Sequence, residues 1–427
     1  MKVLIVGGGG REHAIALKIK ENQEVTALYA APGNGGIAQI ATCLPFKATD
    51  VEGIVRWAAE NKVDFVIVAP DDPLCLGMVD ALAEQGIPAF GPRKNAAIIE
   101  GSKVFSKNLM KKYGIPTAAY ETFDDYDAAV KYLQTADMPI VVKADGLALG
   151  KGVLICPDRE SAVEAVASMM KEAKFGASGA RVVIEEFLTG PEVSVLAFTD
   201  GKTVKPMVSS MDHKRALDHD EGLNTGGMGT IAPNPCYTPE LARRCMDEIF
   251  LPTIAAMNAE GRTFTGCLYF GLMMTPKGPK VIEYNCRFGD PETQVVLPLL
   301  KSDLLTIMRA TVDGTLADTP VEFASGAACC VVLASGGYPV SYKSGYPISG
   351  LDEAGETATV FHAGTKLVDG QIVTAGGRVL GVTATANTLE AAIDKAYQAA
   401  DKITFTDMHM RRDIGQRALA SRKESHS

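Results

Sequence analysis

Two lysines and several glycines stand in a pattern suited to binding phosphate groups. Residues 139–153 begin as an apolar strand that ends in Lys143 and continue through Gly146, Gly150, Lys151 and Gly152. Glycines let backbone N–H groups approach phosphate oxygens closely, and lysines offset the charge of a triphosphate. The segment is not a P-loop, because a glycine stands where that motif has Ser or Thr. It predicts either a phosphate-binding loop of another kind or an ordinary β-hairpin with surface lysines.

A carboxylate and an amide lie together on a later strand. Residues 280–285 read as a strand, and Glu283 and Asn285 are two positions apart, so their side chains share one face. Mg²⁺ takes few protein ligands, all oxygens, and completes its coordination with phosphates and water. The pair therefore predicts a magnesium site, with a polar strand edge as the alternative. The string that follows at residues 287–294, Arg-Phe-Gly-Asp-Pro-Glu-Thr-Gln, is far more specific.

A third segment is suited to hold the nucleoside. An apolar strand from residue 182 ends in Glu185 and Glu186 and continues into Phe187 and Leu188. Exposed backbone at such a strand end can read an adenine edge. Glu192, after a Gly-Pro turn, is placed to accept the ribose hydroxyls.

The first strand, residues 2–6, runs into four glycines and a helix. This layout also begins dinucleotide-binding folds, but Glu12 stands at the third fingerprint glycine. The next strand ends before Asn34 without a ribose-binding acid. A single sugar phosphate on the helix N-terminus, helped by Arg11, fits these residues better than a dinucleotide. A purely structural turn is the remaining alternative.

The elements that position these residues predict several domains. Residues 1–100 alternate apolar strands and helices, as in a doubly wound parallel sheet. Residues 101–113 read as an amphipathic helix ended by Gly114 and Pro116. We expect an α/β and α+β multidomain protein, divided into an N-terminal Rossmann-like domain (1–102), a two-lobed domain (103–323, with the small lobe at about 120–188), a small β-rich C-terminal α+β domain (324–420) and a disordered tail (421–427).

The composition of the chain argues against several classes of function. The 427 residues carry a net charge of −9, which argues against an extended nucleic-acid surface. No apolar run approaches the roughly 20 residues that span a bilayer, and the first residues lack a signal-peptide pattern. The nine cysteines are scattered without metal-binding spacing, as in a reducing compartment. These features predict a cytoplasmic protein that binds neither membrane nor nucleic acid.

The three segments, in this order, resemble the ATP-grasp superfamily, which holds ATP between two α+β lobes. The resemblance extends to the helix that begins near Lys103. It implies that Lys103 and Lys143 hold the ATP phosphates and that Glu283 and Asn285 hold Mg²⁺ or Mn²⁺. Many members have a further metal-binding acid on the preceding strand, but residues 269–274 contain none.

More narrowly, the chain is similar to the phosphoribosylamine–glycine ligase family. The matching strings are Gly-Gly-Arg-Glu-His at 9–13, Asn-Thr-Gly-Gly-Met-Gly at 224–229 and Asn-Cys-Arg-Phe-Gly-Asp-Pro-Glu-Thr-Gln at 285–294, and further matches reach residue 380. The resemblance implies ATP-dependent ligation of glycine to 5-phosphoribosylamine through glycyl phosphate, in de novo purine biosynthesis. We expect a monomer or a weak homodimer.

The resemblance assigns roles by position. The expected catalytic residues are Arg287, Asp290 and Asp212. The expected ATP-binding residues are Lys103, Lys143, Gly150, Lys151, Gly152, Glu185, Glu186, Phe187, Leu188, Glu192 and Lys214. The expected substrate-binding residues are Gly9, Gly10, Arg11, Glu12, Asn34, Asp71, Asn224, Gly226, Lys366 and Arg378. The expected metal ligands are Glu283 and Asn285.

Two positions depart from the family pattern. Asp71 stands where the family usually has Glu, and Leu223 replaces the proline that usually precedes the Asn-Thr-Gly-Gly-Met-Gly string. The alternatives are another ATP-grasp ligase or carboxylase of purine metabolism, an NAD-dependent dehydrogenase and a non-catalytic nucleotide sensor. His213 also reads as a hydrogen-bonding loop residue.

Overall fold

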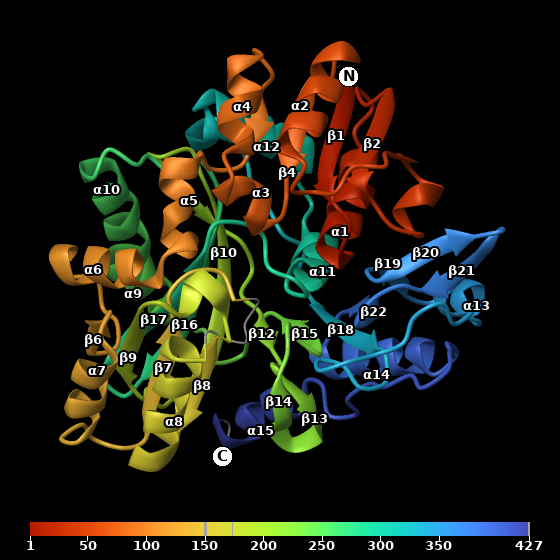
Figure 1. Cartoon of the computed structure of the whole chain (residues 1–427). Helices are drawn as coiled ribbons and strands as arrows, with labels where there is room; N and C mark the ends of the chain where they lie inside the picture. The colour runs from red at the N-terminus through yellow and green to blue at the C-terminus, as the bar shows by residue number, and fades with distance from the viewer. Residues whose placement is uncertain (149–151, 173, 426–427) are drawn as a thin grey trace.

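A computed structural model of the chain describes residues 1–148, 152–172 and 174–425. Its described strands form four sheets of four or five strands and two hairpins. In Figure 1 the N-terminal sheet lies at the top, the small lobe with α7 and α8 at the lower left, and the C-terminal sheet at the right. The multidomain α/β and α+β fold class is confirmed. Within the described part of the chain, no helix has the length and apolar character needed to cross a membrane.

The N-terminal sheet is parallel and has the strand order β3-β2-β1-β4-β5. The strand order reverses at the central strand β1. Ligands of such sheets usually bind at this point, beyond the carboxyl end of the strand. The strands are β1 (Lys2–Gly7), β2 (Ala27–Pro32), β3 (Thr42–Cys43), β4 (Phe65–Val68) and β5 (Ala89–Phe90). The helices are α1 (Gly10–Lys20), α2 (Val51–Glu60), α3 (Asp71–Cys75), α4 (Met78–Glu84) and α5 (Lys94–Gly101).

The small lobe is an antiparallel sheet covered by two helices. Its strand order is β6-β9-β7-β8, and it has an apolar core of its own. The elements are β6 (Tyr120–Phe123), α7 (Tyr126–Leu133), β7 (Ile140–Ala144), β8 (Val153–Cys156), α8 (Arg159–Met170) and β9 (Val182–Glu186).

The large lobe is built on the antiparallel sheet β11-β10-β16-β17. Its side chains share one core with the N-terminal domain, which fixes these two units to each other. The elements are α6 (Lys103–Tyr113), β10 (Glu192–Thr199), β11 (Val204–Pro206), α9 (Pro239–Cys245), α10 (Leu251–Ala259), β16 (Gly266–Thr275), β17 (Gly278–Asn285), α11 (Thr293–Val296) and α12 (Leu304–Asp313).

The C-terminal sheet has the order β12-β15-β18-β22-β19, and α14 packs on β18 and β22. Two of its strands come from before residue 324, so it receives residues from the middle of the chain. The elements are β12 (Met211–Asp212), β15 (Gly229–Ala232), β18 (Ala327–Ala334), α13 (Leu351–Gly355), β19 (Thr359–His362), β22 (Arg378–Ala386), α14 (Leu389–Ala400) and α15 (Gln416–Ser425). The hairpins are β13 (Arg215–Leu217) with β14 (Glu221–Asn224), and β20 (Thr365–Val368) with β21 (Gln371–Thr374).

The structure corrects two sequence predictions. The helix expected over 101–113 begins at Lys103, because Ser102 has an extended backbone and its side chain caps the amide of Phe105. The tail expected to be disordered from residue 421 is helical as far as Ser425. Ala418 and Leu419 pack α15 onto the C-terminal core and so stabilise this helix.

Candidate active site

The two lysines that we expect to hold the ATP phosphates lie where the small lobe meets the large lobe. Lys103 begins α6, and its ammonium donates to the carbonyl of Gly146 at 2.7 Å. Lys143, near the end of β7, contacts the carboxylate of Glu185 at 2.6 Å. Its ammonium also donates at 3.3 Å to the carbonyl of Ile282 on β17. A lysine of the small lobe therefore reaches the strand of the large lobe that carries Glu283 and Asn285.

Glycine at position 271 makes room for the Glu283 side chain. Gly271 on β16 pairs with Glu283 on β17, next to an irregularity in the strand register. A Cβ atom on Gly271 would lie 3.1 Å from Cγ of Glu283, which is tighter than ordinary packing. This glycine occupies the strand on which many ATP-grasp proteins carry an acid. A larger side chain at this position would press against the Glu283 side chain.

Positive charges surround the Glu283 carboxylate. The ammonium of Lys214 lies 3.7 Å from it. Burial alone would raise the pKa of Glu283, but Lys214, Lys143, Lys103 and Arg287 together lower it below its ordinary value. Conversely, burial alone would lower the pKa of Lys214, but Glu283 and Glu192 raise it well above its ordinary value. These pKa shifts favour the charged forms of both side chains.

Glu283 and Asn285 fit a magnesium ion. The Asn285 amide donates to the carbonyl of Tyr284, and its oxygen accepts from Arg287 at 3.4 Å. Among the described residues, no three His, Cys, Asp or Glu side chains cluster as a metal site. A carboxylate and an amide oxygen are enough for Mg²⁺, because phosphate and water supply its other ligands.

The residues that we expect to bind the nucleoside lie at the end of β9 and the start of β10. Glu186 accepts from the backbone amide of Ala119 at 3.1 Å, and Phe187 and Leu188 follow it. Glu192 begins β10 with an exposed side chain that lies 4.0 Å from Lys214. Gly152 precedes β8, and its carbonyl accepts from the amide of Ala144. Gly150 and Lys151 lie outside the described residues.

A polar cavity of about 330 Å³ lies at the glycine turn between β1 and α1. It is lined by Gly8, Gly9, Gly33, Asn34, Asp290, Ala363, Gly364, Thr365, Ala375 and Arg378. Four residues expected to bind substrate or to act in catalysis, namely Gly9, Asn34, Asp290 and Arg378, thus meet in one place. They come from the N-terminal domain, from the segment after β17 and from the C-terminal domain.

Asp290 organises this cavity. Its carboxylate accepts from the backbone amide of Arg11 at 3.1 Å and from the side chain of Gln294 at 2.8 Å. Burial alone would raise the pKa of Asp290, but Arg378 and Arg11 lower it below its ordinary value. Arg378 lies 3.6 Å from this carboxylate and donates to the carbonyl of Gly226 at 2.8 Å.

Arg11 and Glu12 brace the glycine turn and do not line the cavity. The Arg11 guanidinium donates to Glu12 at 2.7 Å and to the carbonyl of Phe288 at 3.0 Å. Glu12 also accepts from the amide of Gly9 at 2.7 Å. Gly10 begins α1 directly after this turn, and the Asn34 side chain donates to the carbonyl of Gly8. The structure thus brings the backbone of the turn to the cavity.

The other expected substrate residues lie around this centre. Asn224 ends β14 beside Gly226, whose amide donates to the hydroxyl of Tyr338. Lys366 is exposed on β20, one residue after a cavity-lining residue. Asp71 begins α3, and its charge acts on Arg287.

The Arg287 guanidinium is held by a partner that the sequence analysis missed. Glu100 on α5 contacts it at 3.0 Å and accepts from the amide of Cys286 at 2.7 Å. Within the described structure, the buried Nε of Arg287 has no hydrogen-bond acceptor. It is a donor aimed by its neighbours and free to bind a ligand.

Two further acidic side chains, the half-buried Asp212 and the buried Glu292, interact with each other. Burial and the charge of Glu292 raise the pKa of Asp212 well above its ordinary value. The hydroxyl of Tyr269 donates to Glu292 at 3.3 Å. His213 bonds the carbonyl of Gly229 and the amide of Gly415, as a structural loop residue would.

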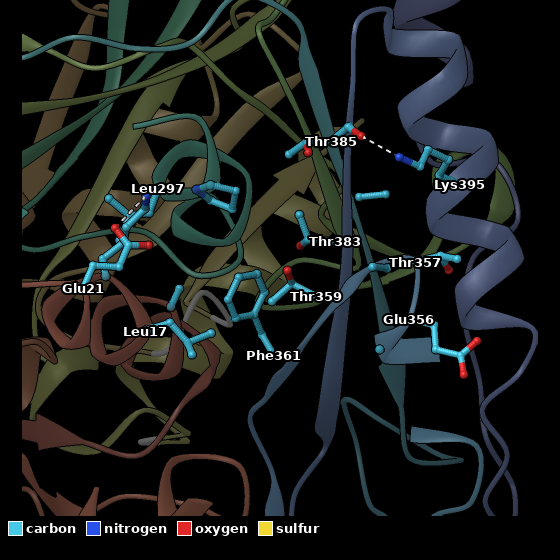
Figure 2. Close-up of a pocket in the computed structure, with 16 residues that line it drawn as sticks. Leu17, Glu21, Leu297, Glu356, Thr357, Thr359, Phe361, Thr383, Thr385 and Lys395 are labelled. Carbon is cyan, nitrogen blue, oxygen red and sulfur yellow. Dashed lines mark hydrogen bonds and ion pairs between the residues drawn. The ribbon is translucent and has the colours of Figure 1, made fainter. Parts of the chain in front are cut away.

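Another cavity does not contain these residues. It measures about 570 Å³ and lies between α1 and the C-terminal sheet, as Figure 2 shows. One of its lysines, Lys395, donates to the carbonyl of Thr385. No residue expected to act on substrate lines it, so the chemistry is assigned to the two polar regions above.

Known proteins match the whole arrangement. Three family models match, described as Phosphoribosylglycinamide synthetase N domain over residues 1–100, ATP-grasp (A) domain over 101–293 and C domain over 328–417. The phosphoribosylamine–glycine ligase of Halalkalibacterium halodurans is 48% identical over 425 residues, covering 100% of this chain and 99% of that protein. That of Allochromatium vinosum is 49% identical, covering 98% and 99%.

The chain belongs to the phosphoribosylamine–glycine ligase family. The resemblance stated from its motifs is confirmed. A crystal structure of phosphoribosylamine–glycine ligase from Thermotoga maritima has a TM-score of 0.86 and 36% identity, covering 97% of this chain and 100% of that one. The biotin carboxylase domain of the Hydrogenobacter thermophilus 2-oxoglutarate carboxylase has a TM-score of 0.72 and 18% identity, which shows the fold alone.

Proposed function

We propose that this member of the phosphoribosylamine–glycine ligase family joins glycine to 5-phosphoribosylamine at the expense of ATP. The products are glycinamide ribonucleotide, ADP and phosphate, and the pathway is de novo purine biosynthesis. One observation carries the proposal. Residues 283–290 run from the edge with Glu283 and Asn285 to the cavity with Asp290, so a single segment joins a triphosphate site to a sugar-phosphate site.

The chemistry needs an activated carboxylate. A glycine carboxylate oxygen attacks the γ-phosphorus, the bond to the β-phosphate oxygen breaks, and glycyl phosphate and ADP result. The amine of phosphoribosylamine then attacks the acyl carbon, phosphate leaves with the former carboxylate oxygen, and the amine loses one proton. Positioning and charge stabilisation perform such a transfer without a covalent enzyme intermediate.

The described residues divide this work. Lys143 would face the phosphates from β7 of the small lobe and Lys103 from the start of α6, and Glu283 and Asn285 would hold the metal from β17. A bound Mg²⁺ or Mn²⁺ offsets charge on the phosphate oxygens. Arg287, with a free and buried Nε, is placed to bind the glycine carboxylate or the acyl phosphate.

Two carboxylates are candidates for the glycine ammonium and for proton transfer. Asp290 is ionised and lines the cavity, so it suits a cation. Asp212 is half-buried and close to Glu292, and its pKa is raised, so it suits a group that holds or accepts a proton. The backbone turn at Gly9 and Gly10 suits the 5-phosphate.

The setting of the enzyme is also proposed. All nine cysteines are free thiols, which agrees with a reducing cytoplasm. A monomer or a weak homodimer remains our expectation.

ADP release tests the function. Each of glycine, phosphoribosylamine and ATP is omitted in turn, and the full mixture is repeated with glycine labelled with ¹⁸O in its carboxylate. We expect release only with all three, and one ¹⁸O atom in the phosphate product. Release driven by bicarbonate or formate in place of glycine, or unlabelled phosphate, would contradict the proposal.

A further inference from the structure

Lys107 on α6 is a buried lysine that no motif singles out. It lies one turn after Lys103, and its side chain is 3% exposed. Its ammonium contacts one carboxylate oxygen of Glu185 at 2.7 Å, and the other carboxylate oxygen lies 2.6 Å from Lys143. All three side chains are less than a tenth exposed. One buried carboxylate is thus shared by two lysines.

The three groups do not balance in charge. Two ammonium groups and one carboxylate leave one positive charge in a buried place, and buried charge is costly without a partner. Burial lowers the pKa of Lys107 to about 8; Glu185 opposes this shift, whereas Lys143 and Lys280 add to it. A phosphate group beside Lys143 would supply the negative charge that these three side chains lack.

The same lysine connects the two lobes. Its ammonium also donates to the hydroxyl of Thr117 at 2.7 Å, and that hydroxyl donates to the carbonyl of Val281 at 2.7 Å. Val281 lies on β17, two residues before Glu283. A continuous chain of contacts therefore runs from Lys143 of the small lobe to the strand with the expected metal ligands.

We propose that Lys107 is a positioning residue for the triphosphate. It shares Glu185 with Lys143, fixes the Lys143 ammonium between the lobes, and leaves this trio one positive charge for a phosphate to neutralise. Lys107 acts through Glu185 and Lys143. This inference rests on the proposed use of ATP.

Binding of a non-hydrolysable analogue, adenylyl imidodiphosphate with Mg²⁺, tests the inference by calorimetry on the full chain. We expect Lys107→Met to raise the Kd by about 10- to 100-fold, the effect of losing one charge close to a polyanion. The KM for ATP rises by a similar factor, while the KM for glycine stays within about twofold, because uniform loss of ATP binding leaves the other substrate alone. Lys111→Met, an exposed lysine one turn later on α6, is the matched control and binds normally.

Two more variants separate charge from packing. Lys107→Gln keeps a donor for Thr117 but lacks the charge, so it binds the analogue as weakly as Lys107→Met. Lys107→Arg keeps the charge and recovers at least half of the lost binding free energy. Thermal unfolding shows which variants fold. Wild-type affinity in a folded Lys107→Gln protein would overturn the inference.

The two proposals fail separately. If the wild-type protein binds the analogue but releases no ADP with glycine and phosphoribosylamine, the proposed function is wrong, and binding still decides the role of Lys107. If the wild-type protein is an active ligase and the Met and Gln variants bind the analogue normally, only the role of Lys107 is wrong.

Discussion

Replacing Glu283 by glutamine removes one charge and almost no volume. The carboxylate lies 3.7 Å from Lys214, and at an effective dielectric constant of about 20 such charges attract by about 4 kcal/mol. Partial exposure of both side chains reduces this to about 2 kcal/mol. A divalent ion bound at the same oxygen carries twice the charge of a lysine. Glu283→Gln should therefore lose at least about 30-fold in turnover, and removal of single charge-stabilising groups typically costs 10² or more.

The assay is steady-state ADP release at saturating glycine and phosphoribosylamine over a range of Mg²⁺ concentrations. Glu248→Gln is the control, because Glu248 pairs with Arg244 on the surface of the same lobe. We expect normal turnover in the control and a higher Mg²⁺ requirement in Glu283→Gln. Turnover within twofold of wild type at every Mg²⁺ concentration would refute the metal assignment.

Three further predictions concern single residues. Gly271→Ala places a methyl group against Glu283, so we expect a several-fold higher Mg²⁺ requirement with little change in melting temperature; an unchanged Mg²⁺ titration would contradict this. Arg378→Met removes the guanidinium that lines the glycine-turn cavity, so the KM for phosphoribosylamine should rise at least about tenfold while the KM for ATP stays constant. Equal changes in both constants would place the acceptor elsewhere. Burial, together with His362, lowers the pKa of His13 to about 3. The unfolded chain therefore binds a proton near pH 6.5 that the folded protein takes up only near pH 3, and the free energy of unfolding falls by about 1.4 kcal/mol per pH unit in that window. Urea unfolding at pH 7 and pH 5 should show a fall smaller by about 2 kcal/mol in His13→Gln than in wild type, and an identical fall would disprove the assignment.

Local patterns were enough to predict the strands and the turn that carry several candidate site residues. Glu283 and Asn285 share a face because strand side chains alternate, and Lys143 marks the end of a strand visible from its apolar run. The glycine turn before α1 followed from four consecutive glycines after a strand. The parallel sheet followed from the alternation of strands and helices in the first hundred residues.

Partners that come from distant segments were not predictable. Glu185 follows Lys107 by 78 positions, and Glu100 meets Arg287 across a gap of 187. One signal was present: Lys103 and Lys107 are four residues apart and share a face of α6. That spacing could have indicated a second lysine near the phosphates. It could not have indicated the carboxylate that Lys107 shares with Lys143.

The partners of the side chains that follow the glycine turn were also not predictable from the sequence. Arg11 next to a helix N-terminus suggested a direct phosphate contact, but its guanidinium bonds Glu12 and the carbonyl of Phe288. The sequence gives no sign of this pairing, because Phe288 is far along the chain. The short strands β12 and β15, of two and four residues, were likewise too brief to show a periodic pattern, so their place in the C-terminal sheet came only from the structure.

We propose that one triphosphate is held between Lys103 and Lys143 on one side and the edge with Glu283 and Asn285 on the other. A crystal structure with adenylyl imidodiphosphate and Mn²⁺, located by its anomalous scattering, tests this directly. We expect the ion to be bound by oxygens of Glu283 and Asn285, with phosphate oxygens on the two lysines. An ion elsewhere, or the nucleotide phosphates on the glycine turn at Gly9, would contradict it.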